Sequence, residues 1–401
     1  MQESTTPVVL LATLRTDLET LLRRRVLEVI GIVLEEEIDA ALGCKRYDRV
    51  DGRRGYRNGH DDREITTQHG LVGVKVPRAR VFEADGSSHE FQSKVLPRYA
   101  RRTERVDEVI LSAYLGGVNT RRVRLVLEPL LGPNNLSKSA VSRVTSQLKA
   151  LFNEWDTRDL RDEFCPIVIL DAINLKVRLA RRVVSAPVLV VLGVGPDGVK
   201  RVIALRLAAS EAATCWGDLI GDLQRRGMPA PLLVVTDGHR GLIKALENWP
   251  HTLVQRCTVH KRRNLMDHCP VHAQREVRRD YDRIVNASGG REAAEAYAAF
   301  VSKWSRLCPP VVRSLEDAGH DLLTFYQFPR ALWRAIRTTN SIENLNREFR
   351  RRTKTQASFS TEAAALTLLY GLLAFGQIPT RKIDGHFALR DLLRDDAAIA
   401  A

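Results

Sequence analysis

Five short apolar runs between Cys165 and Asp237 limit this chain to folds that contain a β-sheet, because each run has the length of a buried strand. The runs are Ile167–Leu170, Leu175–Leu179, Pro187–Val194, Val199–Leu207 and Leu232–Val235. The turn signal Pro196-Asp197-Gly198 joins the third run to the fourth, and a helical pattern from Glu211 to Arg226 precedes the fifth. Strands in hairpin order, followed by a helix and then another strand, predict a mixed α/β sheet rather than a sandwich.

Two aspartates, Asp171 and Asp237, each follow one of these buried runs. Open α/β sheets place their ligands at strand ends, because side chains emerge there from a rigid core. The alternative is a turn-forming or helix-capping role. The sequence supports this alternative more strongly for Asp237, because Gly238 follows it. Asp171 is followed by Ala172 and Ile173, and a buried acid in that setting needs a partner or a cation.

A third acid, Glu343, begins a segment rich in arginine. A helix starting near Asn340 would place Glu343 as a capping-box partner, which is a purely structural role. The same helix would align the acid with a row of cations and place apolar side chains opposite, a pattern typical of a metal-bound acid beside a DNA backbone. An exposed, salt-bridged helix is the competing interpretation. The cations that we expect to contact DNA are Arg347, Arg350, Arg351 and Lys354, and the apolar residues are Ile342, Leu345 and Phe349.

The segment Gln255–Asn264 contains Cys257 and His260 at a spacing that zinc ligands use. Further zinc ligands would have to come from His268, Cys269 and His272, which do not repeat a ligand pair at finger-like spacing. Two other interpretations remain open. Cys257 and His260 either brace an active site by packing, or the histidine lies near the phosphate that is cut.

Two regions of different amino-acid composition precede the sheet. Residues Val8 to about Leu42 have apolar residues at helical spacing, and Gly43 is a plausible helix C-terminus. From Cys44 to about Arg105 the chain is rich in Arg, Gly, His and Asp, with short strand-like runs such as Val72–Val76. The basic, glycine-rich segment Asp51–His60 suits either a phosphate-contacting loop or a solvated linker.

Three short helical patterns follow one another between Thr103 and Trp155. The first ends at Gly116-Gly117, Thr120 can cap the second, and Ser137 can cap the third. Short helices joined by tight turns, the last with a basic face, indicate a helix-turn-helix reader of DNA, although any small helical bundle has this pattern. The basic residues that we expect to contact DNA on the third helix are Lys138, Arg143 and Lys149.

The overall composition agrees with a DNA-bound protein of the cell interior. Lys and Arg outnumber Asp and Glu by 62 to 48, giving a net charge of +14 that favours a polyanionic partner, although many basic proteins bind no nucleic acid. The longest apolar run, Ala186–Val194, has roughly half the ~20 residues that a membrane-spanning helix needs. The first residues lack the basic region of a signal peptide, and the six cysteines are scattered singly, so we expect a cytoplasmic, nucleoid-associated protein with reduced thiols.

Taken together, these segments resemble the Mutator-type family of bacterial insertion-sequence transposases. The order of the pieces and a Cys-x-x-His motif soon after the second aspartate make the resemblance specific, and Asn174 departs from it where an aromatic residue is expected. The matching pieces are Gly55–Gly59, Val76–Arg78, Leu170–Ile173 with Lys176–Arg178, Val235–Gly238, Gln255–Asn264 and Thr338–Glu343.

The resemblance implies a ribonuclease H-like catalytic core, interrupted by an all-helical insertion and preceded by helical DNA-binding regions. It maps an Asp-Asp-Glu triad onto Asp171, Asp237 and Glu343, which would hold two Mg²⁺ or Mn²⁺ ions. Cys257 and His260 would support the triad. The expected regions are 1–105 (helical and basic), 106–160 (helix-turn-helix-like), 161–270 (first part of the core), 271–333 (insertion) and 334–401 (completion of the core with C-terminal helices).

The sequence therefore predicts a DNA transposase that binds the terminal inverted repeats of an insertion sequence and cuts and joins DNA. Its partners would be the repeats and target DNA, and pairing two ends requires at least a homodimer in the active complex. Two alternatives remain. One is a host nuclease or resolvase on the same core, and the other is a DNA-binding regulator that has no catalytic activity.

Overall fold

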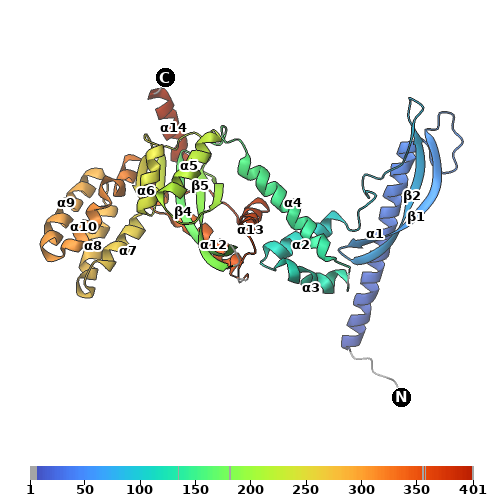
Figure 1. Cartoon of the computed structure of the whole chain (residues 1–401), viewed down its shortest axis with the longest axis horizontal. Coiled ribbons are helices and arrows are strands. Elements are labelled where there is room, and N and C mark those ends of the chain that lie inside the picture. The colour runs from blue at the N-terminus through green and yellow to red at the C-terminus, as the bar shows by residue number, and fades with distance from the viewer. Residues whose placement is uncertain (1–6, 134, 180–181, 355, 357, 400–401) are drawn as a thin grey trace, which may run out of the picture. The chain divides into compact units, whose positions relative to one another are not determined.

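The computed structural model describes residues 7–133, 135–179, 182–354, 356 and 358–399. The chain forms two compact units, Met1–Ser146 and Gln147–Ala401. Figure 1 shows both units.

In the first unit, a long helix packs on a small antiparallel sheet. Helix α1 (Pro7–Leu42) confirms the predicted first helix, and Gly43 ends it with a φ of 69°. The sheet has the order β1-β2-β3, with β1 (Gly55–Thr67), β2 (Gly70–Phe82) and β3 (Ser88–Glu90). Strand β2 alternates between buried and exposed residues, because only one of its faces packs against α1.

The expectation that Asp51–His60 forms a loop or a linker is wrong for its second half, because β1 begins at Gly55. Only glycine fits at this position. Its φ is 150°, and a Cβ would lie 2.0 Å from the backbone oxygen of Arg80 on the neighbouring strand. Gly55 therefore serves close strand pairing.

The three predicted short helices are α2 (Glu104–Leu115), α3 (Thr120–Leu131) and α4 (Lys138–Thr157). Ser137 accepts a hydrogen bond from the amide of Ala140 at 3.1 Å, so its capping role is confirmed. Thr120 is not a cap, because Asn119 takes that place and accepts from the amide of Arg122. The basic residues expected to contact DNA, Lys138, Arg143 and Lys149, are all exposed.

The second unit contains a five-stranded mixed sheet, which confirms the predicted α/β architecture. Its order is β6-β5-β4-β7-β8. Strands β4, β5 and β6 form antiparallel pairs, whereas β7 is parallel to β4, and β8 is parallel to β7. The strands are β4 (Ile167–Leu179), β5 (Arg182–Val194), β6 (Lys200–Leu207), β7 (Leu233–Thr236) and β8 (Leu253–Arg256).

The first two predicted strands are one continuous strand, β4, so Asp171 lies within a strand and not at its end. The reason is that β4 has two neighbours of unequal length. It pairs with β5 along its whole length, but with β7 only through Ile167–Leu170. Asp171 is therefore the first residue of β4 beyond the edge of β7.

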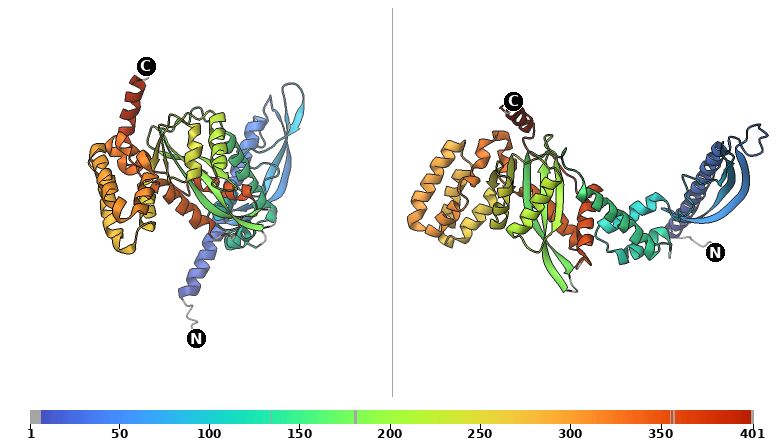
Figure 2. Two further views of the ribbon diagram at one scale, coloured as in Figure 1. Left: turned by 60° about the vertical axis from the view of Figure 1, so that its left-hand side comes forward. Right: turned by 45° about the horizontal axis from the view of Figure 1, so that its top comes forward.

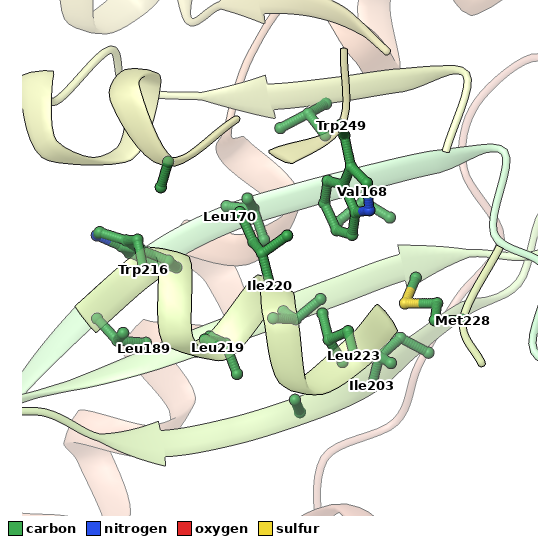
Figure 3. Close-up of a cluster of buried hydrophobic side chains, with 14 of the residues drawn as sticks. Val168, Leu170, Leu189, Ile203, Trp216, Leu219, Ile220, Leu223, Met228 and Trp249 are labelled. Atoms are coloured by element: carbon green, nitrogen blue, oxygen red, sulfur yellow. The ribbon is translucent and has the colours of Figure 1, made fainter. Parts of the chain in front are cut away.

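Helices α5 (Ala213–Arg225) and α6 (Arg240–Ala245) contribute to an apolar core on one face of this sheet. Figure 3 shows Trp216, Leu219 and Ile220 of α5 packed against Val168 and Leu170 of β4. Since side chains alternate along a strand, Asp171 points to the opposite face. Helices α12 (Asn340–Thr353) and α13 (Glu362–Ala374) contact β4 as well, and both follow the helical stretch described next.

The stretch Val271 to Trp333 is helical, as predicted, and has a core of its own that includes Tyr281, Phe300 and Trp304. Figure 2 shows these helices beside the sheet of the same unit. In order, the elements from β7 to α12 include η1 (Leu246–Asn248), α7 (Thr258–Asp267), η2 (Val271–Ala273), α8 (Gln274–Val285), α9 (Gly290–Leu307), α10 (Pro309–Glu316), η3 (Gly319–Leu322), η4 (Thr324–Gln327), η5 (Arg330–Leu332) and α11 (Trp333–Ile336).

The last helix of the described chain is α14 (Phe387–Ile399). No helix in the described part of the chain combines the length and the apolar content that a membrane-spanning segment requires.

We expect Leu219→Ala to lower the free energy of unfolding of the second unit by about 2–5 kcal/mol, because it leaves a cavity beside Trp216 and Ile220. Leu307→Ala is the matched control, since that leucine is 66% exposed, and it should change the free energy by less than about 0.5 kcal/mol. Urea unfolding followed by tryptophan fluorescence measures both. Equal losses for the two variants would contradict this assignment of the core.

Candidate active site

The parallel pairing of β4 with β7 places two acids side by side. The last paired residues are Leu170 and Thr236, and Asp171 and Asp237 follow them directly. Burial raises the pKa of Asp171 to about 6, and the charge of Asp237 adds to this effect. The amide of Ala172, His260 and Asn346 favour the charged form but do not outweigh burial. The two aspartates predicted from the sequence therefore do interact.

Asp237 also has the turn role that the sequence offered as an alternative. Its Oδ1 accepts hydrogen bonds from the amide of His239 at 2.8 Å and from the hydroxyl of Thr236 at 3.3 Å. Gly238 between them has a φ of 88°, which explains the glycine. These contacts fix the orientation of the carboxylate at the start of α6 and are compatible with a ligand role for Oδ2.

Helix α12 brings Glu343 and Asn346 to the same face of the sheet as Asp171. Asn346 is completely buried, and its Nδ2 donates a hydrogen bond of 2.8 Å to Oδ2 of Asp171. Its Oδ1 is also buried and has no hydrogen-bond partner among the residues that the structure describes. Sequence reasoning missed Asn346. Its position three residues after Glu343, on an adjacent part of the helix surface, is the signal that could have identified it.

Thr339, which is completely buried, joins three of the site's side chains. Its Oγ1 donates to Glu343 Oε1 at 2.9 Å, and it lies 3.3 Å from both Cys257 Sγ and His260 Nδ1. Glu343 is not a capping-box partner of Asn340, because α12 begins at Asn340 and its N-cap is Thr339. The carboxylate instead accepts from the hydroxyl of Thr339. The sequence did not single out this threonine.

His260 interacts electrostatically with all three acids. Its Nε2 is 3.8 Å from Glu343 Oε1, and its charge favours the ionised form of Asp171. The hydrogen bond with Cys257 is the main cause that raises the pKa of His260, and Glu343 and Asp237 add to it. Burial opposes ionisation of Cys257, but hydrogen bonds with His260 and Thr339 outweigh it and lower the pKa of the thiol.

Among the residues that the structure describes, one group could hold a metal ion through three clustered ligand atoms. Its members are Cys257, His260 and Glu343, whose ligand atoms lie within 4.8 Å of one another. The residues predicted to complete a zinc site, His268, Cys269 and His272, are not part of it. Asp171 and Asp237 are not part of it either.

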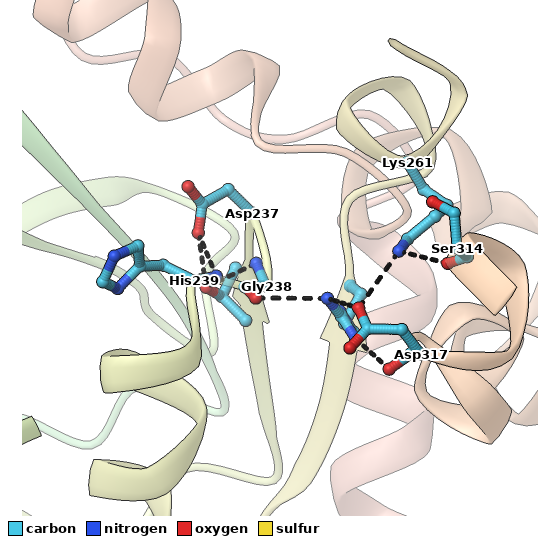
Figure 4. A network of polar contacts seen from close by, with 8 residues as sticks. Asp237, Gly238, His239, Lys261, Ser314 and Asp317 are labelled. Atoms are coloured by element: carbon cyan, nitrogen blue, oxygen red, sulfur yellow. Dashed lines mark hydrogen bonds and ion pairs between the residues drawn. The ribbon is translucent and has the colours of Figure 1, made fainter. Parts of the chain in front are cut away.

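Arg256, at the end of β8, connects the loop that carries Asp237 to helix α10. Figure 4 shows this network, with Asp237 and Gly238 on one side and Lys261, Ser314 and Asp317 on the other. Its Nη2 donates to the backbone oxygen of Gly238 at 3.1 Å and to Oδ2 of Asp317 at 2.9 Å. Lys261 lies 3.3 Å from the same carboxylate and donates to the backbone oxygen of Ser314 at 2.7 Å. Both cations are buried, so this cluster fixes the helical stretch against the aspartate loop.

The polar face of α12 agrees with the predicted helical pattern. Ile342, Leu345 and Phe349 are buried. The cations predicted to contact DNA are all exposed; they are Arg347, Arg350, Arg351 and Lys354. Arg351 also pairs with Glu348 at 3.0 Å. These exposed positions allow contact with DNA.

The raised pKa of Asp171 has a consequence for the metal-free protein. The folded value of about 6 lies above the ordinary value of 3.8, so the stabilising effect of the protonated carboxyl is complete below pH 4 and is lost as the pH rises through 6. In EDTA, we expect the free energy of unfolding of the wild type to fall over this range relative to Asp171→Asn, by at most about 3 kcal/mol. Urea unfolding at several pH values measures the difference. Parallel pH curves for the two proteins would contradict the assignment.

Comparison with known proteins places the chain in a family. The description of the matching family is "Transposase, Mutator family", and the match covers residues 2–376. The transposase for insertion sequence element ISRM5 of Rhizobium meliloti is 34% identical over 88% of this chain and 86% of the relative. Those for IS905 of Lactococcus lactis and for IS256 in transposon Tn4001 of Staphylococcus aureus are 31% and 30% identical, over 91% and 86% of this chain and 91% and 87% of the relatives. This chain belongs to the Mutator family of transposases.

Proposed function

We propose that this transposase binds the ends of an insertion sequence and catalyses metal-dependent cleavage and strand transfer of DNA, with Asp171, Asp237 and Glu343 as the metal ligands. One observation carries the proposal. The register of β4 and β7 sets the two aspartates side by side, and the hydrogen bond from Asn346 to Asp171 ties α12, and with it Glu343, to the same edge of the sheet. The relatives described above are all named as transposases for insertion sequence elements.

A ribonuclease H-like core is part of this proposal. Three antiparallel strands followed by two parallel strands, in the order β6-β5-β4-β7-β8, support it. The helical stretch between β8 and α12 would then be an insertion into the core, since it has its own apolar core. We propose that the domains of the chain follow the boundaries expected from the sequence, which are 1–105, 106–160, 161–270, 271–333 and 334–401.

The residues of the site fit divalent cations in two respects. Asp171 and Asp237 are adjacent acids of which one is largely buried, so a cation between them would relieve both their repulsion and the cost of burial. Carboxylate and amide oxygens are the ligands that Mg²⁺ and Mn²⁺ prefer, and within the described part of the chain the buried Oδ1 of Asn346 has no hydrogen-bond partner. We infer a requirement for two such ions.

When bound, two such ions supply activation of the attacking oxygen and stabilisation of the leaving oxygen in an in-line phosphoryl displacement. The protein orients the acids for this task. Asn346 holds one oxygen of Asp171, the turn at Gly238 holds one oxygen of Asp237, and Thr339 holds one oxygen of Glu343. No side chain of the protein needs to form a covalent bond with DNA, because water or a DNA 3′-hydroxyl can attack directly.

Cys257 and His260 support Glu343 in this scheme. Thr339 contacts both of them and also donates to the carboxylate, so the cluster limits the positions that Glu343 can adopt. A zinc ion bound by Cys257, His260 and Glu343 is the second candidate, favoured by the close approach of their ligand atoms.

DNA binding would involve two groups of cations. The exposed face of α4 (Lys138, Arg143 and Lys149) would contact the terminal repeats, and the exposed face of α12 (Arg347, Arg350, Arg351 and Lys354) would hold the strand near the acids. Pairing of two ends would require at least a homodimer. The protein would act on chromosomal DNA in the cytoplasm, together with the nucleoid.

We expect Asp171→Asn, Asp237→Asn and Glu343→Gln each to reduce cleavage at the element boundary by about 10³-fold or more, because each removes one charged ligand. Purified proteins are incubated with DNA that carries the ends of the element, in Mg²⁺ or Mn²⁺ and in EDTA. Asp218→Asn is the matched control, since Asp218 is exposed on α5.

Three outcomes separate the alternatives. Equal cutting by Asp171→Asn and wild type would refute the triad. Binding of ends without any cutting, with or without metal, would favour a regulator. Cutting of any DNA regardless of the element ends would favour a nuclease or a resolvase.

A separate measurement distinguishes the two roles of Cys257. If it braces Glu343, wild-type protein contains no bound zinc, and Cys257→Ser, which keeps a hydrogen-bonding side chain, retains more cleavage than Cys257→Val. Elemental analysis of the purified protein together with both cleavage rates gives the answer. One zinc per chain that is lost in both variants would support the zinc site instead.

A further inference from the structure

A groove of about 470 Å³ lies beside α12, and most of its charged lining residues are cations. These lining residues are Lys200, Arg347, Glu348, Arg351, Arg352 and Arg381. Pockets for small molecules are lined mainly by apolar and aromatic side chains, with few charges. Five cations around one carboxylate instead favour an extended anion.

Four parts of the second unit line the groove. They are α12, Leu192 of β5, the start of β6, and residues 377–381 after α13. Direct contacts connect several of these parts. Arg352 Nη2 donates to the backbone oxygen of Gln377 at 3.1 Å. Beyond the groove, the amide of Ile383 donates to the backbone oxygen of Gly198 at 3.0 Å. The groove is therefore a built feature of the fold.

The positive charge of the groove is only partly compensated. Glu348 is shared by Arg351 and Arg352. Within the described residues, Lys200 and Arg381 have no ion-pair partner closer than 4.0 Å. Burial, together with the charge of Arg381, lowers the pKa of Lys200, and Asp384 opposes this effect. A bound anion would favour the charged form of this lysine.

Cations that line the groove follow Glu343 around the surface of α12. Arg347 and Arg351 follow Glu343 by four and eight residues, which places them about 40° and 80° further around the helix. Ser341, Asn344 and Glu348 lie further round still and line the groove itself. Cations therefore form a path from Glu343 to Lys200 and Arg381.

We propose that this groove binds the sugar–phosphate backbone of the DNA strand that flanks the bond being cut. The inference rests on the proposed function, because it takes Glu343 as the point where that strand is cut. Guanidinium groups bind phosphate oxygens in pairs, and contacts of this kind position a strand without reading its sequence. The groove therefore adds affinity for flanking DNA of any sequence.

The test measures binding in EDTA, so that no DNA is cut. Two duplexes carry the same element end, one stopping at the element boundary and one continuing into flanking DNA. We expect the double variant Lys200→Gln, Arg381→Gln to bind the flanked duplex more weakly than wild type does. The slope of log Kobs against log salt should fall in magnitude by about 1–2, since each lost phosphate contact removes about 0.9. Binding of the duplex without a flank should not change.

Two control variants keep the result specific. Arg381→Lys retains the charge and should retain most of the salt slope. Arg291→Gln removes an arginine whose side chain is 95% exposed on α9, and it should leave both duplexes unaffected. Thermal unfolding of each variant shows whether it is folded.

An unchanged slope on the flanked duplex, with the double variant folded, would overturn the proposal. So would an equal loss on both duplexes, because it would place Lys200 and Arg381 at the element end. This result is independent of the triad, since no cleavage is measured. If Asp171→Asn cuts like wild type, the proposed chemistry fails whatever the groove binds.

Discussion

The site depends on the parallel pairing of two strands of unequal length. Because β7 ends at Thr236 while β4 continues, the first residue of β4 beyond their shared ladder lies next to the first residue after β7. Both residues are aspartates. Burial and the charge of Asp237 disfavour the ionised form of Asp171, as its raised pKa indicates. The apolar core on the opposite face supplies the rigidity that keeps the two acids together.

The third acid, Glu343, lies at this edge of the sheet only because a long helical stretch between β8 and α12 brings the chain back to it. A structureless loop between β8 and α12 would leave the position of Glu343 undefined, whereas the helices between them form a packed body with its own core. Arg256 connects that body to the loop of Asp237, and Thr339 connects the start of α12 to Cys257 at the start of α7. Removing Asp317 would leave Arg256 and Lys261 buried without their carboxylate, which would destabilise this connection.

Much of this arrangement could be predicted from local sequence patterns. The apolar runs predicted the mixed sheet, and the helical spacing around Glu343 predicted which face of α12 is buried. The patterns failed where a partner lies far away in sequence. Asp171 was placed at a strand end because nothing local shows that β5 supports the strand beyond it. Asn346 was missed because its partner, Asp171, is 175 residues away, and the role of Thr339 depends on Cys257, 82 residues away.

Helix α12 carries three different sets of side chains, because the helical period places each set on its own side of the helix. Ile342 and Phe349 pack against the core, Glu343 and Asn346 face the acids, and the arginines that follow lie progressively further round. A strand or a loop could not present three such sets at once, since a strand has two faces and a loop has no fixed period. One acid, Glu343, and three cations of the groove therefore lie on one helix; the cations are Arg347, Arg351 and Arg352. In the proposed complex, a DNA strand that contacts these cations would lie along α12 toward Glu343.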